Sequence, residues 1–306
     1  MSSGVAGPRH IPISTPVGTF EVQTQSVGES PTIKLLLLHG GPGVNHEYFE
    51  TFADYLPDAG IEIIYYDQLG SFGSDQPDDM SLWDLPRFVD EVEQVRLALG
   101  LDASNFFLLG HSWGGILGIE YALTYGQHLK GLIVSNMMSD IPAYNHYAHD
   151  VLMPQMNQAA LARILEIEAE EDYDNPEYEE LLMEHFYVFH VLRRPADQWP
   201  ECVDRSFGHT NKQVYVHMQG PSEMGARGTL VEWSRFDDLD KIDVPTLVIG
   251  ARHDTMDPDH LRVMAERFPR GEFLYCPDGS HMAMYDDAET YLPGLIDFLH
   301  EVDAAG

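Results

Sequence analysis

Residues 106–122 read FFLLGHSWGGILGIEYA, and this stretch is the most informative part of the sequence about the fold. The apolar run at its start is typical of a buried strand, and the run at its end is typical of a helix. Between them, residues 110–114 have the form G-x-S-x-G, in which the serine occupies a sharp, strained strand-to-helix turn. The flanking glycines carry no Cβ, so strand and helix can approach closely. The pattern predicts that Ser112 is an exposed nucleophile.

A serine hydroxyl needs a base, and the base needs an orienting acid. Residues 245–250 (PTLVIG) predict a buried parallel strand, and Asp254 lies in the loop that follows. Because active sites assemble at the carboxyl ends of parallel strands, Asp254 is predicted to lie near Ser112. Asp257 and Asp259 are alternatives, but Asp257 precedes a proline at the start of the next helix, where a carboxylate caps free N–H groups.

The base is predicted to be His281. Residues 272–275 (EFLY) indicate the last strand, and His281 lies in the loop after it. The order Ser, Asp, His along the chain is one of the known orders for such a triad. His111 and His253 are the alternatives, but neither follows a final strand.

Two backbone N–H groups are expected to form an oxyanion hole. One belongs to Trp113, the residue after the nucleophile. The other should come from the loop after an earlier strand, and residues 34–38 (KLLLL) are followed by the glycine-rich residues 39–43 (HGGPG). Glycine lets backbone approach a substrate carbonyl closely, so Gly41 is the predicted second donor.

Four segments together resemble one known family, the proline iminopeptidases (prolyl aminopeptidases). The resemblance extends from about residue 16 to about residue 302 and is more specific than the G-x-S-x-G motif alone. It implies an α/β-hydrolase fold, a mainly parallel doubly wound sheet with an inserted helical cap. The segments are HGGPG (39–43), YDQLG (66–70), GHSWGG (110–115) and GSH (279–281).

The resemblance also implies an activity. These enzymes release an N-terminal residue, classically proline, from peptides through an acyl-enzyme, and the family includes enzymes that act on amino-acid amides. A small peptide or amino-acid amide is therefore the expected substrate, with no cofactor and no metal. An amino-acid amidase or an esterase with the same Ser112, Asp254 and His281 triad is the alternative. Dehalogenase and epoxide-hydrolase chemistry is disfavoured, because those relatives carry an aspartate where this chain has Ser112.

A further match is Glu223, in the segment GPSE at residues 220–223. The family's equivalent glutamate binds the free α-amine of the substrate, and a partly desolvated carboxylate suits that cation. The sequence departs from the family at Thr255, where relatives often carry a second amine-binding glutamate directly after the triad aspartate. The amine site then relies on Glu223 or on another acid that the sequence does not identify.

Strand and helix patterns alternate along most of the chain, which favours a doubly wound sheet. Residues 1–138 and 228–306 are the predicted hydrolase core, and residues 139–227, which lack strong strand signals, are the predicted cap. The core is expected to hold an antiparallel strand pair (11–15, 18–24), strands at 32–38, 61–66, 106–109 and 132–134, and helices near 46–56, at 85–99 and at 288–302. The cap is expected to hold helices at 159–170, 177–191 and 198–207.

The chain is strongly acidic. It carries 50 Asp and Glu against 17 Lys and Arg, a net charge of −33. Such a surface repels nucleic acid and anionic membranes, so neither is an expected partner. Because concentrated salt screens like charges, one hypothesis is a protein of a high-salt cytoplasm; the alternative is a moderately acidic mesophilic enzyme.

A cytoplasmic location is the expectation. Residues 1–10 lack the charged and apolar regions of a signal peptide, and no apolar run approaches the length of a membrane span. The two cysteines, Cys202 and Cys276, do not suggest a disulfide framework or a zinc site.

Overall fold

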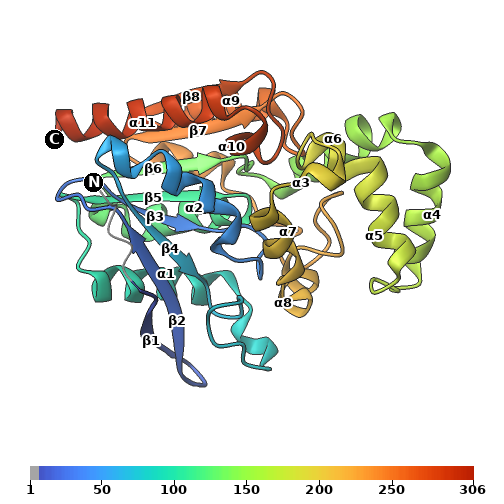
Figure 1. Ribbon diagram of the computed structural model, residues 1–306, viewed down its shortest axis with the longest axis horizontal. Coiled ribbons are helices and arrows are strands. Elements are labelled where there is room, and N and C mark those ends of the chain that lie inside the picture. The colour runs from blue at the N-terminus through green and yellow to red at the C-terminus, as the bar shows by residue number, and fades with distance from the viewer. Residues whose placement is uncertain (1–6) are drawn as a thin grey trace.

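An eight-stranded sheet in the order β1-β2-β4-β3-β5-β6-β7-β8 forms the centre of the protein (Figure 1). The computed structural model describes residues 7–306. Strands β1 and β2 pair antiparallel at one edge, β2 pairs antiparallel with β4, and the strands from β4 to β8 run parallel. The strands are β1 (Arg9–Thr15), β2 (Gly18–Val27), β3 (Lys34–Leu38), β4 (Glu62–Asp67), β5 (Phe106–His111), β6 (Gly131–Ser135), β7 (Thr246–Ala251) and β8 (Gly271–Cys276).

Both faces of the central parallel strands β3, β5, β6 and β7 are buried, which explains why they read as mainly apolar runs, whereas the edge strand β8 is mostly half-buried or exposed. Alternate side chains enter two separate cores. Leu36 and Leu108 pack with helices α1 (Leu85–Leu99), α2 (Trp113–Tyr125) and α9 (Pro258–Arg267). Leu37 and Leu109 pack on the other face, against the 3-10 helix η1 (His46–Asp54) and α11 (Ala288–Ala305).

The expected core elements are present, which confirms the predicted α/β fold. The predicted helix at 85–99 has the bounds of α1, and Asp257 caps α9 by accepting from the N–H of Asp259. The stretch near 46–56 differs from the prediction, because it forms the 3-10 helix η1 rather than an α-helix.

The chain between β6 and β7 is mainly helical, and Figure 1 shows its helices gathered at one end of the sheet. The predicted helix at 177–191 is interrupted: a π-helical turn at Met183–Tyr187 separates two shorter helices. Two helices, α3 (Ile141–Tyr147) and α8 (Lys212–Met218), were not predicted. The helices are α3 (Ile141–Tyr147), α4 (Gln158–Ala169), α5 (Pro176–Leu182), α6 (Val188–His190), α7 (Glu201–Gly208) and α8 (Lys212–Met218).

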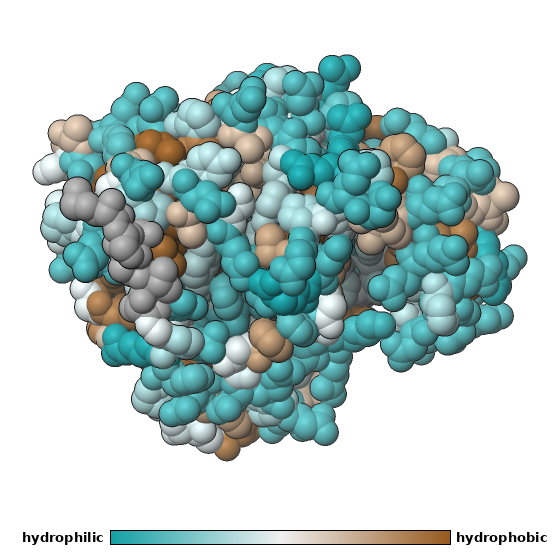
Figure 2. All heavy atoms as spheres, in the orientation of Figure 1, coloured by the Kyte–Doolittle hydropathy of each residue, from teal (hydrophilic) through white to brown (hydrophobic). Residues whose placement is uncertain are grey.

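The face of the molecule drawn in Figure 2 is mostly hydrophilic, with small scattered apolar groups. Within residues 7–306, no helix is long and apolar enough to cross a membrane. Most of the segment considered for a signal peptide, residues 1–6, lies outside the described part of the chain.

Candidate active site

Ser112 occupies the turn between β5 and α2. Its backbone has φ 56° and ψ −128°, a region that non-glycine residues rarely adopt. A Cβ at Gly110 would lie 1.9 Å from the carbonyl oxygen of Gly114, and one at Gly114 would lie 2.1 Å from that of Leu38. Only glycine fits at both positions, so the motif enforces the strained turn. Ser112 lines a cavity of about 160 Å³.

Asp254 and His281 meet at the same edge of the sheet. His281 Nδ1 lies 2.8 Å from Asp254 Oδ1, and both residues are buried. Burial alone would lower the pKa of His281, but the charge of Asp254 and the hydrogen bond to it prevail and raise that pKa above its usual 6.5. Because Nδ1 is committed to Asp254, Nε2 is the ring nitrogen available to a substrate or nucleophile. His281 lines the same cavity as Ser112.

Asn136 holds the other oxygen of Asp254, and the sequence analysis missed it. Its Nδ2 donates to Asp254 Oδ2 at 2.7 Å and to the carbonyl oxygen of Ser280 at 3.2 Å. It is fully buried and has φ 54°, a left-handed conformation. Asn136 therefore ties the acid's loop to the loop that carries His281. A signal was available, because Asn136 directly follows β6 at the carboxyl edge of the sheet.

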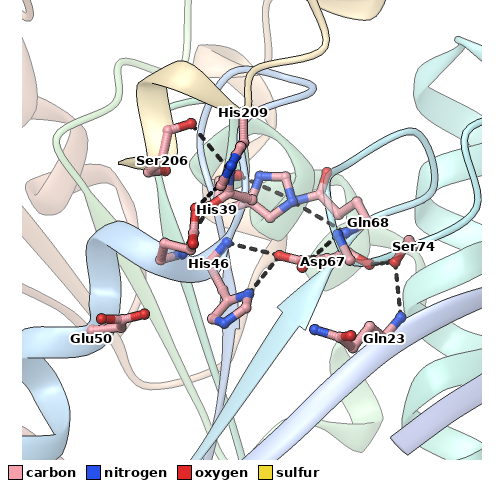
Figure 3. Close-up of polar contacts among 12 residues, drawn as sticks. Gln23, His39, His46, Glu50, Asp67, Gln68, Ser74, Ser206 and His209 are labelled. Carbon is pink, nitrogen blue, oxygen red and sulfur yellow. Dashed lines mark hydrogen bonds and ion pairs between the residues drawn. The ribbon is translucent and has the colours of Figure 1, made fainter. Parts of the chain in front are cut away.

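The loop of residues 39–43 packs against Ser112. A Cβ at Gly40 would lie 3.1 Å from Ser112 Cβ, and Gly41 has φ 111°. His39 Nε2 accepts from the N–H of Gln68 at 3.1 Å, so its Nδ1 carries the proton and donates to the carbonyl oxygen of Gly40 at 2.8 Å (Figure 3). The C=O and N–H of a trans peptide point in opposite directions. His39 thereby fixes the direction of the Gly41 N–H.

The YDQ segment, residues 66–68, supports the loop of residues 39–43 through hydrogen bonds. Asp67 accepts from the backbone N–H and from Nδ1 of His46, both at 2.8 Å (Figure 3). Despite burial, which acts against it, the pairing with His46 lowers the pKa of Asp67. Gln68 Oε1 accepts from Trp113 Nε1 at 2.8 Å. The two motifs, HGGPG and YDQ, are thus one hydrogen-bonded unit beside Ser112.

Glu223 lines the cavity from the helical segment. It is half-buried, and its Oε1 accepts from the hydroxyl of Tyr215 at 2.5 Å. The hydroxyl of Tyr144 donates to its backbone oxygen at 2.8 Å. Burial, followed by the nearby Glu223 charge, raises the pKa of Tyr215 well above 10, so this tyrosine remains a donor. Glu223 therefore presents a carboxylate at the cavity wall, and the hydrogen bonds from Tyr215 and Tyr144 fix its position.

Thr255 does not line the cavity. It is buried, with its Oγ1 3.2 Å from His281 Nδ1 and 3.4 Å from Asp254 Oδ1. The carboxylates that do line the cavity within the described chain are Glu223 and Glu179, and Glu179 is solvent-exposed.

Cys202 and Cys276 are free thiols. No group of three or more His, Cys, Asp or Glu side chains among residues 7–306 is arranged to hold a metal ion.

The fold agrees with the comparisons with known proteins. The model of the alpha/beta hydrolase fold family matches residues 34–288. The crystal structure of VinJ superposes with a TM-score of 0.88 at 29% identity, covering 96% of this chain and 99% of that one.

Relatives over nearly the whole length are more specific. The chain is 50% identical over 293 residues to the proline iminopeptidase of Flavobacterium johnsoniae, covering 96% of this chain and 98% of that protein. It is 51% identical over 295 residues to the proline iminopeptidase of Elizabethkingia meningoseptica, again covering 96% and 98%. The crystal structure of a Mycobacterium smegmatis proline iminopeptidase has a TM-score of 0.85 at 30% identity, covering 98% of this chain and 99% of that one. The chain belongs to the proline iminopeptidase family of α/β hydrolases.

Proposed function

We propose that the protein is a serine aminopeptidase that releases N-terminal proline, or a similar small residue, from peptides. The observation that carries the proposal is that one cavity is lined both by Ser112 and His281 and by the half-buried carboxylate of Glu223. A nucleophile and a cation-binding group in one cavity suit a substrate with a free amine next to its reacting carbonyl. The close similarity to proline iminopeptidases over nearly the full chain supports this assignment.

In the proposed mechanism, Ser112 Oγ attacks the carbonyl carbon of the first residue while His281 Nε2 accepts its proton. Asp254 holds the imidazole through Nδ1 and stabilises the imidazolium that forms. His281 then protonates the leaving amine, and the peptide bond breaks. Water, deprotonated by His281, hydrolyses the acyl-enzyme and frees the amino acid.

The backbone N–H groups of Gly41 and Trp113 are the proposed oxyanion donors. Such donors stabilise the negative oxygen of the tetrahedral intermediate, and loss of one typically costs about 3 kcal/mol of transition-state stabilisation. The fixed direction of the Gly41 peptide, held by His39, supports its role because preorganised dipoles need no reorientation during the reaction.

Glu223 is the proposed anchor for the substrate ammonium. A charge-assisted hydrogen bond to a half-buried carboxylate is stronger than one to an exposed group, because water screens it less. The same contact excludes acylated N-termini and internal peptide bonds, since these carry no ammonium to pair with the carboxylate.

Residues 139–227 are the proposed cap over a core formed by residues 1–138 and 228–306. The run of helices from α3 to α8 between β6 and β7 supports this division, and hydrogen bonds hold the proposed cap against the core. The N–H groups of His281 and Met282 donate to the carbonyl oxygens of His190 and Val191, both at 2.9 Å. His209 Nδ1 also lies 2.8 Å from Glu47 Oε2. The cap is therefore anchored beside the triad loop.

A cytoplasmic location in a high-salt cell is the proposed setting. The net charge of −33 supports it, because salt screens the mutual repulsion of surface carboxylates.

The test is hydrolysis of proline p-nitroanilide beside its N-acetylated form and alanine p-nitroanilide, in about 2 M salt, where screening is strong. The proposal expects fast cleavage of only the free prolyl substrate. Cleavage of the acetylated form, or of neither prolyl substrate, would instead identify an amidase or esterase whose cap recognises something other than an N-terminus.

A further inference from the structure

A chain of three hydrogen bonds connects the loop of residues 39–43, the nucleophile turn and the loop of His281. The N–H of Gly40 lies 2.7 Å from the hydroxyl oxygen of Tyr48, which lies 3.0 Å from His111 Nδ1. His111 Nε2 in turn lies 2.8 Å from the carbonyl oxygen of His281. Tyr48 comes from η1, and His111 is the residue before Ser112.

The direction of every bond in this chain is determined. A carbonyl oxygen only accepts, so His111 Nε2 must carry a proton. Burial and the neighbouring His281 lower the pKa of His111 to about 3, so its ring is neutral and Nδ1 has no proton. Nδ1 therefore accepts from the Tyr48 hydroxyl, whose oxygen accepts from the Gly40 N–H. All these groups are buried, and the arrangement leaves none of them unpaired.

This chain of hydrogen bonds holds the backbone of Gly40, where a small displacement would affect the oxyanion loop. With its N–H held by Tyr48 and its C=O held by His39, Gly40 is fixed at both ends of its backbone. The Gly40 N–H is thereby committed to Tyr48, so it does not compete with the Gly41 N–H, the proposed oxyanion donor on this loop. Gly40 also packs against the side chain of Ser112, so a shift of the loop would change the distance between nucleophile and donor.

We propose that Tyr48 and His111 are positioning residues that hold the oxyanion loop in register with Ser112 and His281. The proposal rests on the assigned serine hydrolysis. It adds a role for the variable residue of the G-x-S-x-G motif, which the triad itself does not use.

The test compares Tyr48→Phe with Tyr65→Phe. Tyr65 is also buried, on β4; its hydroxyl lies 3.4 Å from the backbone oxygens of Phe49 and Glu50, and Tyr65 does not line the cavity. Misplacement of a catalytic group by about 1 Å costs about a hundredfold in rate. Tyr48→Phe is therefore expected to lower kcat about ten- to a hundredfold with KM little changed, while Tyr65→Phe leaves both close to wild type.

A transition-state mimic separates positioning from a structural role. Pyrrolidine-2-boronic acid forms a tetrahedral adduct with an active serine, whereas free proline binds without one. The proposal expects Tyr48→Phe to weaken boronate binding by the same factor as kcat while free-proline binding is retained. Retention of wild-type kcat, or equal losses of boronate and proline binding, would overturn it.

A double variant tests whether the two residues act as one unit. His111→Gln keeps an N–H donor for the His281 carbonyl oxygen but moves the acceptor away from Tyr48. Tyr48→Phe/His111→Gln is expected to be no slower than the slower single variant. If the loss of kcat in the double variant equals the product of the two single losses, Tyr48 and His111 do not act as one unit.

Failure of the proposed prolyl substrate can be distinguished from failure of the positioning proposal. If the wild type does not cleave proline p-nitroanilide, the prolyl assignment is wrong. The same variant-to-wild-type ratios are then measured with p-nitrophenyl acetate and phenylboronic acid.

Discussion

Replacing Asn136 by glycine or by alanine separates the role of its side chain from the strain in its backbone. Both variants remove the amide that donates to Asp254 Oδ2 at 2.7 Å. They differ in the backbone, because φ 54° is freely available to glycine and costly for alanine. Their stabilities should therefore differ, while their loss of activity should be the same.

The magnitudes follow from the contacts. A hydrogen bond to a charged group contributes about 1.5–3 kcal/mol, and Asp254 keeps its bonds to His281 Nδ1 and to the Met256 N–H. Asn136→Gly should therefore lower the free energy of unfolding by about 1–3 kcal/mol. Asn136→Ala should lower it by about 1 kcal/mol more, because a left-handed conformation costs an L-residue about 1–2 kcal/mol. For both, kcat should fall about ten- to a hundredfold, since the acid is no longer held from two sides.

The assay is denaturant unfolding beside kcat on whichever p-nitroanilide or ester the wild type cleaves. The reasoning fails if kcat follows stability, with the alanine variant tenfold slower than the glycine variant. It also fails if both variants retain wild-type kcat, because Asp254 would then need no support from Asn136.

Four further outcomes are expected. Ser112→Ala should lower kcat at least about a thousandfold with an unchanged circular dichroism spectrum; an active variant would exclude Ser112 as the nucleophile. Glu223→Gln should lower kcat/KM for a free prolyl p-nitroanilide about 10–100-fold, with little effect on p-nitrophenyl acetate, and equal losses would refute an amine anchor. The neutral form of His281 is the base and its pKa is raised, so kcat/KM should fall as the pH drops through a value above 6.5; a midpoint below 6.5 contradicts this. The melting temperature should rise between about 0.1 and 3 M KCl, and no rise would refute adaptation to salt.

The sequence was informative wherever a local pattern has a single physical cause. The central parallel strands β3, β5 and β7 are buried on both faces and read as mainly apolar runs, so they could be located from the apolar pattern alone. The glycines at 110 and 114 are required by contacts with Gly114 and Leu38, and the motif reports that constraint directly. The positions of Asp254 and His281 follow from strand ends, although their roles in catalysis remain predictions.

The parts that escaped prediction depend on contacts between residues far apart in the chain. Asn136 is separated from Asp254 by 118 residues, and Tyr48 from His111 by 63. The end of β6 places Asn136 at the carboxyl edge of the sheet but does not identify Asp254 as its partner, and a tyrosine in a helical turn is ordinary on its own. The π-helical turn at Met183–Tyr187 also escaped prediction, because no proline or glycine marks it in the sequence.

The structure shows what the departure from the family pattern at Thr255 means for the charge of the cavity. Its hydroxyl packs against the Asp254–His281 pair, so this position contributes no charge to the cavity. The carboxylates left at the cavity wall are Glu223 and Glu179. Water screens the exposed Glu179 strongly, whereas Glu223 is half-buried and held by Tyr215. Under the proposed function, a substrate ammonium would therefore interact mainly with Glu223, and we expect amine recognition to depend on this one carboxylate.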